Sequence, residues 1–194
     1  MPSKWYDRVI KDAKLTYYND AGAWKPLVMK AVDTFNNQLP FGVTLDKADN
    51  HIGANIVVRF SHGTGQDPDF SWAKANFDAE HVHGQTVANI DHKGRVDKAV
   101  IFLPGRLQKV KDDVKELVIV HELIHACGLV EKNDHDPVGG VLYASLQLVN
   151  GRLQEPPGDS KTKIDGMPPV RVGHWTQCQM AHLWNKNGRP DESQ

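Results

Sequence analysis

The stretch VKDDVKELVIVHELIHACG, residues 110–128, decides the fold. It is the strongest helix signal in the chain, and its second half is apolar on nearly all sides. A surface helix keeps one polar face, so this pattern predicts a central, buried helix. Gly128 stands where a glycine commonly ends a helix. We therefore expect the rest of the chain to pack around this helix.

Strand and helix signals alternate on both sides of it. Apolar residues at helical spacing over 23–39, with Pro26 in the first turn, predict an amphipathic helix packed on a sheet. Residues rich in strand formers, some followed by turn signals, predict strands at 15–19, 41–46, 54–60, 85–91 and 96–104. We expect residues 61–84 to be mostly irregular and residues 141–154 to form a hairpin that turns at Asn150-Gly151. Residues 174–185 should form a final helix.

Length and composition limit the classes of function. The 194 residues predict one domain, and 40% hydrophobic with 24% charged residues is ordinary for a globular chain. A formal net charge of -1 gives no reason to expect nucleic acid or a membrane surface as partner. No apolar run reaches 18 residues and no Sec-type signal peptide is visible, so we expect a protein that is cytoplasmic as made, with release by a non-Sec route left open. As a separate expectation, we take the protein to be a monomer. Cys127 and Cys178 are too few for a disulfide framework and are expected to be free, buried thiols.

The motif HELIH within the central helix predicts a metal site. His121 and His125 are four residues apart, so they lie on one face of a helix and can bind the same Zn²⁺. Glu122 can accept the proton of a metal-activated water as general base. The motif also occurs by chance in proteins without a metal. Unpaired His and Glu side chains on so apolar a helix would be costly, which favours the metal.

A catalytic zinc needs a third protein ligand and an open position for water. The candidates after the turn at Gly128 are Glu131, Asp134 and His135.

At this point HELIHACG resembles the metzincin zinc peptidases, whose pattern is HExxHxxGxxH. In that family the third ligand follows the glycine by three residues, and here that position holds Glu131. If about four residues are inserted in the loop, the segment ending in Asp134-His135 realigns with the family pattern. The resemblance then makes His135 the third ligand, with Glu131 and Asp134 as alternatives.

The segment DGMPPVRVGHWTQCQMAHLW, residues 165–184, is similar to the end of a metzincin of the matrixin type. The resemblance implies that Met167 forms the Met-turn, a soft apolar base beneath the metal ligands. It also implies that Pro168 and Pro169, followed by Val170, line the pocket for the residue just after the cleaved bond.

The order of elements before the motif also looks like a matrixin catalytic domain. The resemblance implies an α/β (α+β) zincin-like fold: a twisted mixed sheet with an antiparallel edge strand, packed on helices. It implies an N-terminal subdomain of about 1–128 and an irregular C-terminal subdomain of about 129–194 that ends in a helix. The function implied is a zinc endopeptidase whose peptide substrate lies extended along the edge strand, about 85–91.

Two rival hypotheses remain open at the level of sequence. One is a zinc amide hydrolase that acts on cell-wall peptides, as a phage or secreted effector protein. The other is a non-catalytic zinc-binding domain.

A second cluster of histidines, with Asp67 and Asp69 nearby, has two interpretations. We favour exposed loop histidines, because the spacing does not match the H-x-D arrangement of matrixins. The alternative is a second, structural Zn²⁺ or Ca²⁺ held by His62, His81, His83 and His92.

Overall fold

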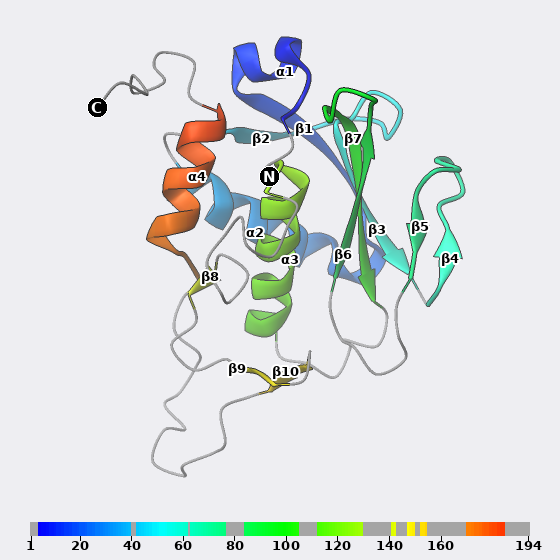
Figure 1. Ribbon diagram of the computed structural model, residues 1–194. Coiled ribbons are helices and arrows are strands. Elements are labelled where there is room, and N and C mark those ends of the chain that lie inside the picture. Colours follow the sequence, from blue (N-terminus) through cyan, green and yellow to red (C-terminus); the bar gives the residue numbers. More distant parts are fainter. Residues whose placement is uncertain are drawn as a thin grey trace.

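The computed structural model describes residues 4–39, 42–61, 63–76, 84–104, 112–129, 141–142, 147–149, 152–154 and 170–184. These residues form a five-stranded sheet with the strand order β2-β1-β3-β7-β6 (Figure 1). Its strands are β1 (Lys14–Asp20), β2 (Thr44–Lys47), β3 (Ile56–Ser61), β6 (Gln85–Ile90) and β7 (Val96–Pro104). The helices are α1 (Asp7–Asp12), η1 (Gly22–Trp24), α2 (Lys25–Gln38), α3 (Asp112–Ala126) and α4 (His174–Trp184).

The sheet is mixed. Strands β2, β1, β3 and β7 run parallel to their neighbours, and β6 pairs antiparallel with β7 at one edge. The β6–β7 pair is joined by a turn that contains Gly94, which has φ 73°. The predicted fold class is confirmed: a mixed, mostly parallel sheet with an antiparallel edge strand packs on helices.

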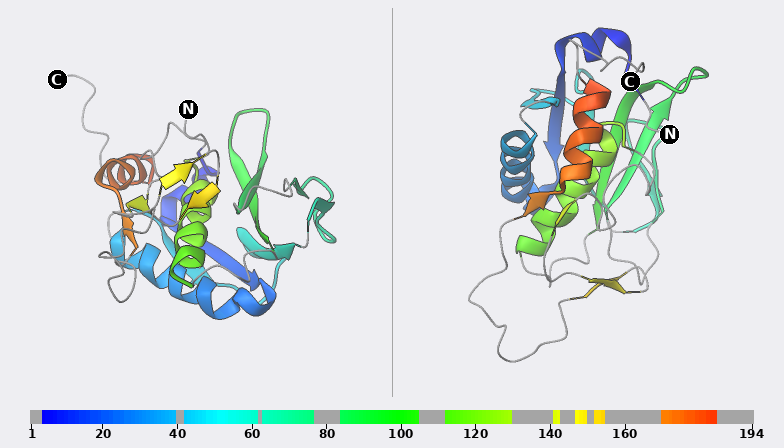
Figure 2. Two further views of the ribbon diagram at one scale, coloured as in Figure 1. Left: turned by 90° about the horizontal axis from the view of Figure 1, so that it is seen from below. Right: turned by 60° about the vertical axis from the view of Figure 1, so that its left-hand side comes forward.

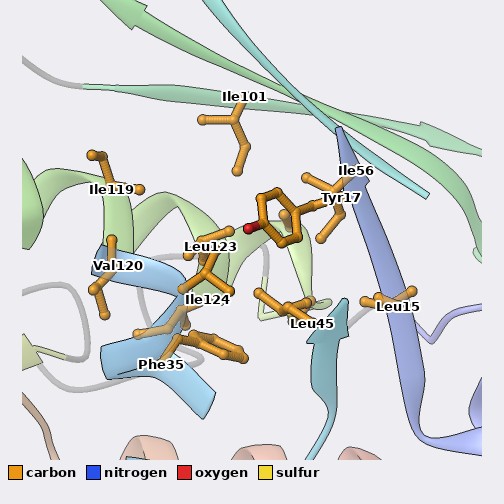
Figure 3. Close-up of a cluster of buried hydrophobic side chains, with 14 of the residues drawn as sticks. Leu15, Tyr17, Phe35, Leu45, Ile56, Ile101, Ile119, Val120, Leu123 and Ile124 are labelled. Carbon is orange, nitrogen blue, oxygen red and sulfur yellow. The ribbon is translucent and has the colours of Figure 1, made fainter. Parts of the chain in front are cut away.

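One face of the sheet is covered by helices α2 and α3, with α4 packed beyond them (Figures 1 and 2). Every second strand residue points to this face, because side chains alternate along a strand. Figure 3 shows Leu15, Tyr17, Ile56 and Ile101 of the strands directed toward Leu123 and other residues of the two helices. Helix α3 is buried along most of its second half, as its apolar sequence predicted.

The other face of the sheet has a smaller apolar cluster. Val57, Val100 and Phe102 point to this side and pack with Ala73 and Ala75. The covering segment contains the short paired strands β4 (Gly65–Gln66) and β5 (Lys74–Ala75), which lie on the side of the sheet away from α3 in Figure 1. Within the segment 61–84, expected to be mostly irregular, these are the short strands that the structure describes.

The C-terminal part contains two further strand pairs. Strands β9 (Gln147–Val149) and β10 (Arg152–Gln154) pair antiparallel, which confirms the hairpin predicted around Asn150-Gly151; those two turn residues lie outside the described ones. Strand β8 (Val141–Leu142) pairs with β11 (Arg171–Val172), which was not predicted. Both cysteines are free, and Cys127 is buried as expected, whereas Cys178 is exposed. Within the described ranges, no helix has the length and apolar character needed to cross a membrane.

Candidate active site

Helix α3 ends in a turn that positions the candidate metal ligands. The Gly128 N–H donates to the carbonyl of His125 at 3.0 Å, and the Leu129 N–H donates to that of Ile124 at 3.4 Å. This is the Schellman arrangement, which needs a left-handed residue after the helix; Gly128 has φ 114°. Ile124 and Leu129 are both fully buried, so apolar packing closes the turn. The chain reverses here and brings the Leu129 carbonyl beside His125.

The Leu129 carbonyl fixes the protonation of the His125 ring. Its oxygen lies 2.6 Å from Nδ1 of His125. A carbonyl oxygen only accepts hydrogen bonds, so a neutral His125 carries its proton on Nδ1 and has a lone pair on Nε2. This is the tautomer of a histidine that binds a metal through Nε2, with its other nitrogen donating to the main chain.

The two histidines direct the same nitrogen toward one point. Nε2 of His125 lies 3.0 Å from Nε2 of His121, and the ring planes are 84° apart. Two imidazole nitrogens on one tetrahedral zinc, each about 2.0–2.1 Å from the ion, lie roughly 3.3 Å apart. The spacing, the ring orientation and the His125 tautomer therefore fit two ligands of a single Zn²⁺.

The predicted third ligand does not belong to the described part of the chain. No group of three or more His, Cys, Asp or Glu side chains there is arranged to hold a metal ion. All three candidates predicted for this position lie outside those residues: Glu131, Asp134 and His135.

Glu122 is buried beside the two histidines. Its side chain is 3% exposed, and Oε1 lies 3.9 Å from Nε2 of His121. The other carboxylate oxygen, Oε2, lies 2.7 Å from Oγ1 of Thr86 on β6, and Oγ1 is also 3.0 Å from the main-chain carbonyl of Glu122. The carboxylate of Glu122 therefore lies between Nε2 of His121 and the edge strand.

A pocket of about 340 Å³ joins the edge strand to α3. Residues of both elements line it: Gly84, Gln85, Thr86, Ala88, Ile90, His121, Glu122 and His125. The four even-numbered residues of the strand side share one face, since side chains alternate along a strand. Sequence reasoning did not single out Gly84 or Thr86. The alternation of Thr86 with Ala88 and Ile90 in the predicted edge strand was the signal that could have identified Thr86, whereas Gly84 precedes that strand.

Most of the other predicted site residues lie outside the described part of the chain: Met167, Pro168, Pro169, His62, His81 and His83. Val170 is buried in the main core cluster. His92 is exposed in the turn between β6 and β7.

The two aspartates near the second predicted metal site contact an arginine. Nε of Arg59 donates to Asp67 at 3.0 Å, and the same guanidinium contacts Asp69 and Asp20. The positive charge that pairs with these carboxylates is therefore the guanidinium of Arg59.

No protein-family model matches the sequence, and the search of curated proteins found no match. Among solved structures, the chain is similar to one of myroilysin with a TM-score of 0.48 and 12% identity, over 96% of this chain and 97% of that chain. It is similar to a second structure of myroilysin with a TM-score of 0.38 and 14% identity, over 65% of this chain but 45% of that one. Both TM-scores are below 0.5.

Proposed function

We propose that the chain is a zinc-dependent endopeptidase, in which His121 and His125 bind the metal and Glu122 is the general base. The observation that carries the proposal is the convergence of three groups in one pocket. The two Nε2 atoms lie 3.0 Å apart, and the buried carboxylate of Glu122 lies next to them. We take His135 as the third ligand, with Glu131 and Asp134 as alternatives.

Peptide hydrolysis by this site needs a water molecule whose pKa is lowered and a group that accepts and transfers its proton. Zinc, when bound, lowers the pKa of water and polarises a carbonyl group. The carboxylate of Glu122 accepts the water proton and returns it to the nitrogen of the leaving amine. The side chain of Glu122 is 3% exposed, so its surroundings exclude most bulk solvent. A carboxylate held in such a place interacts strongly with charge that develops beside it.

The proposed substrate is an extended peptide that adds a strand to β6. The other side of β6 is already paired with β7, and β6 is the last strand in the sheet order. An edge strand offers main-chain N–H and C=O groups to an incoming chain, as in β-augmentation. The pocket lined by β6 and α3 lies along this strand, so a peptide bound there passes next to Glu122 and both histidines.

The test compares the parent with Glu122→Gln. Both proteins are loaded with Zn²⁺, their zinc content is measured, and they are incubated with casein and, separately, with purified bacterial cell wall. We expect equal zinc content and a loss of casein hydrolysis by several orders of magnitude in the variant, because the amide cannot accept the proton. Asp113→Asn, the same change in the first turn of α3, is the matched control and should keep full activity.

Other outcomes would count against the proposal. Full casein hydrolysis by Glu122→Gln would show that Glu122 is not the base. Hydrolysis of cell wall alone would favour the amide hydrolase over the protein peptidase. Zinc bound without hydrolysis of either material would favour the non-catalytic zinc-binding domain.

A further inference from the structure

We propose that Thr86 is a positioning residue that holds the carboxylate of Glu122 in the orientation needed for proton transfer. The proposal rests on the function proposed above and adds a role for the edge strand. Strand β6 would then do two things: offer its main chain to the substrate, and fix the general base with a side chain from its inner face.

The contact between Thr86 and Glu122 is short and lies between distant parts of the sequence. Oγ1 of Thr86 is 2.7 Å from Oε2 of Glu122, a usual length for an O–H···O hydrogen bond. A hydroxyl that donates to a carboxylate makes a stronger bond than one between neutral groups. Oγ1 also lies 3.0 Å from the main-chain carbonyl of Glu122, a second acceptor for the single hydroxyl proton, and the contact with Oε2 is the shorter of the two.

This bond decides which oxygen of Glu122 faces the metal ligands. Oε2 is engaged by the strand, and Oε1 is the oxygen that lies 3.9 Å from Nε2 of His121. A carboxylate has a broad energy minimum about its last torsion angle, and the hydrogen bond from Thr86 to Oε2 restrains that rotation. The Thr86 hydroxyl therefore directs Oε1 toward the place where the proton is taken.

The residue type at position 86 suits this role. Threonine is β-branched, so its χ1 angle is restricted and the hydroxyl has few directions available. Thr86 is also held from the sheet side, where it pairs with Ile101 of β7. A hydroxyl on a stiff side chain in a paired strand is a firmer support than one on a loop.

Gly84, which precedes strand β6 by one residue, leaves the space that the side chain of Glu122 occupies. A Cβ atom built on Gly84 would lie 2.4 Å from Cγ of Glu122 and 3.0 Å from Oε1. Real atoms do not approach so closely, so the base occupies space that only a glycine leaves open. Position 84 leaves room for the carboxylate and position 86 supplies a hydrogen bond to it.

The kinetic test replaces the hydroxyl while keeping the shape. We expect Thr86→Val to lower kcat for a peptide substrate by about 10- to 100-fold, the worth of one hydrogen bond to a charged group, with KM within about twofold. Thr86→Ser, which keeps the hydroxyl, should stay within about threefold of the parent. Zinc content should be equal in all three. Thr44→Val, the same change on strand β2, is the matched control and should leave kcat unchanged.

A double variant separates positioning from a general effect on the fold. In a Glu122→Gln background there is no base to orient, so adding Thr86→Val should cause no further loss of residual activity. A second loss of 10-fold or more there would overturn the proposal, as would parent-like kcat in Thr86→Val alone.

A structural readout does not depend on activity. In crystal structures of the metal-free proteins, the Glu122 carboxylate should keep its place in the parent and Thr86→Ser and leave it in Thr86→Val. An unmoved carboxylate in Thr86→Val would overturn the proposal. If the parent hydrolyses no peptide while the carboxylate moves as expected, the proposed function fails and the positioning by Thr86 stands.

Discussion

The indole N–H of Trp5 donates a 3.0 Å hydrogen bond to the main-chain carbonyl of Ala126, 121 positions further along the chain. Trp184 of α4 does the same for the carbonyl of Cys127, also at 3.0 Å. The last carbonyls of a helix lack partners within the helix, and here two buried indoles donate hydrogen bonds to carbonyls at the end of α3. Ala126 directly follows His125, so both ends of the described chain anchor the turn that carries a candidate metal ligand.

Replacing Trp5 by Phe should weaken this anchor. The ring is kept in part but the donor is lost, which leaves a buried carbonyl without that bond and should lower the free energy of unfolding by about 1–3 kcal/mol. Urea denaturation followed by circular dichroism measures the change. Trp175→Phe is the control, since Trp175 is 53% exposed and its replacement should change stability by less than about 0.5 kcal/mol. Equal stability of the two variants would contradict an anchoring role for Trp5.

Replacing Gly84 by Ala should displace the general base. The added Cβ would meet Cγ of Glu122 at 2.4 Å, so the carboxylate or the strand must shift. A misplacement of about 1 Å in a catalytic group can cost 10²-fold, and we expect kcat to fall by about that factor while zinc is retained. Gly65→Ala is the control, because nothing lies within 4 Å of a Cβ at Gly65. Parent-like kcat in Gly84→Ala would show that the site tolerates the movement.

Much of the fold could be predicted from the sequence, because its main elements have strong local patterns. The helical spacing of 23–39, the alternating strands of 85–104 and the apolar run of 110–128 correspond to α2, the β6–β7 pair and α3. Helix α1 was not predicted: it has six residues and buries none of them fully, so no apolar stripe indicates it. The β8–β11 pair was not predicted either, since each strand has two residues and the partners are brought together only by the tertiary fold.

Some residues of the candidate site are likewise indicated by a local sequence pattern, and others are not. His121, Glu122 and His125 follow from spacing within one helix, and the structure brings the two Nε2 atoms to 3.0 Å. The contact of Thr86 with Glu122 joins residues 36 positions apart on different elements, and no local pattern indicates it. The pairing of Arg59 with Asp67 likewise depends on the path of the chain between β3 and β5. His135 and Met167 stay predictions.

The identity of the third ligand can be tested by zinc content. We expect His135→Ala to lower zinc affinity at least about 100-fold, since changes to residues that merely support a ligand already cost 10- to 100-fold. Glu131→Ala and Asp134→Ala should keep near-parent affinity. Competition with a chelator of known affinity measures all three, and His121→Ala provides the reference for the loss of a ligand. Loss of zinc in Glu131→Ala alone would make Glu131, three residues after Gly128, the third ligand in place of His135.

Arg59 should be required for the stability of the sheet face opposite the helices. Its side chain is 10% exposed and donates to Asp67, whose side chain has no exposed surface. Oδ1 of Asp67 also accepts the N–H groups of Asp69 and Phe70, and Phe70 packs against the apolar cluster on that face. The Arg59–Asp67 ion pair therefore connects β3 to the segment that covers the sheet.

Replacing Arg59 by Met removes the cation while keeping an apolar chain of similar reach. The buried carboxylate of Asp67 loses its partner, and an uncompensated buried charge typically costs 3–5 kcal/mol. We expect the free energy of unfolding to fall by about 3 kcal/mol, the lower end of this range. Asp20 and Asp69 add little to the loss, because both are partly exposed to water. Lys14→Met is the matched control: it breaks an ion pair with Asp46 in which both side chains are about half exposed, which should cost about 0–1 kcal/mol. Chemical denaturation of both variants measures the difference, and equal losses would show that Asp67 finds other compensation.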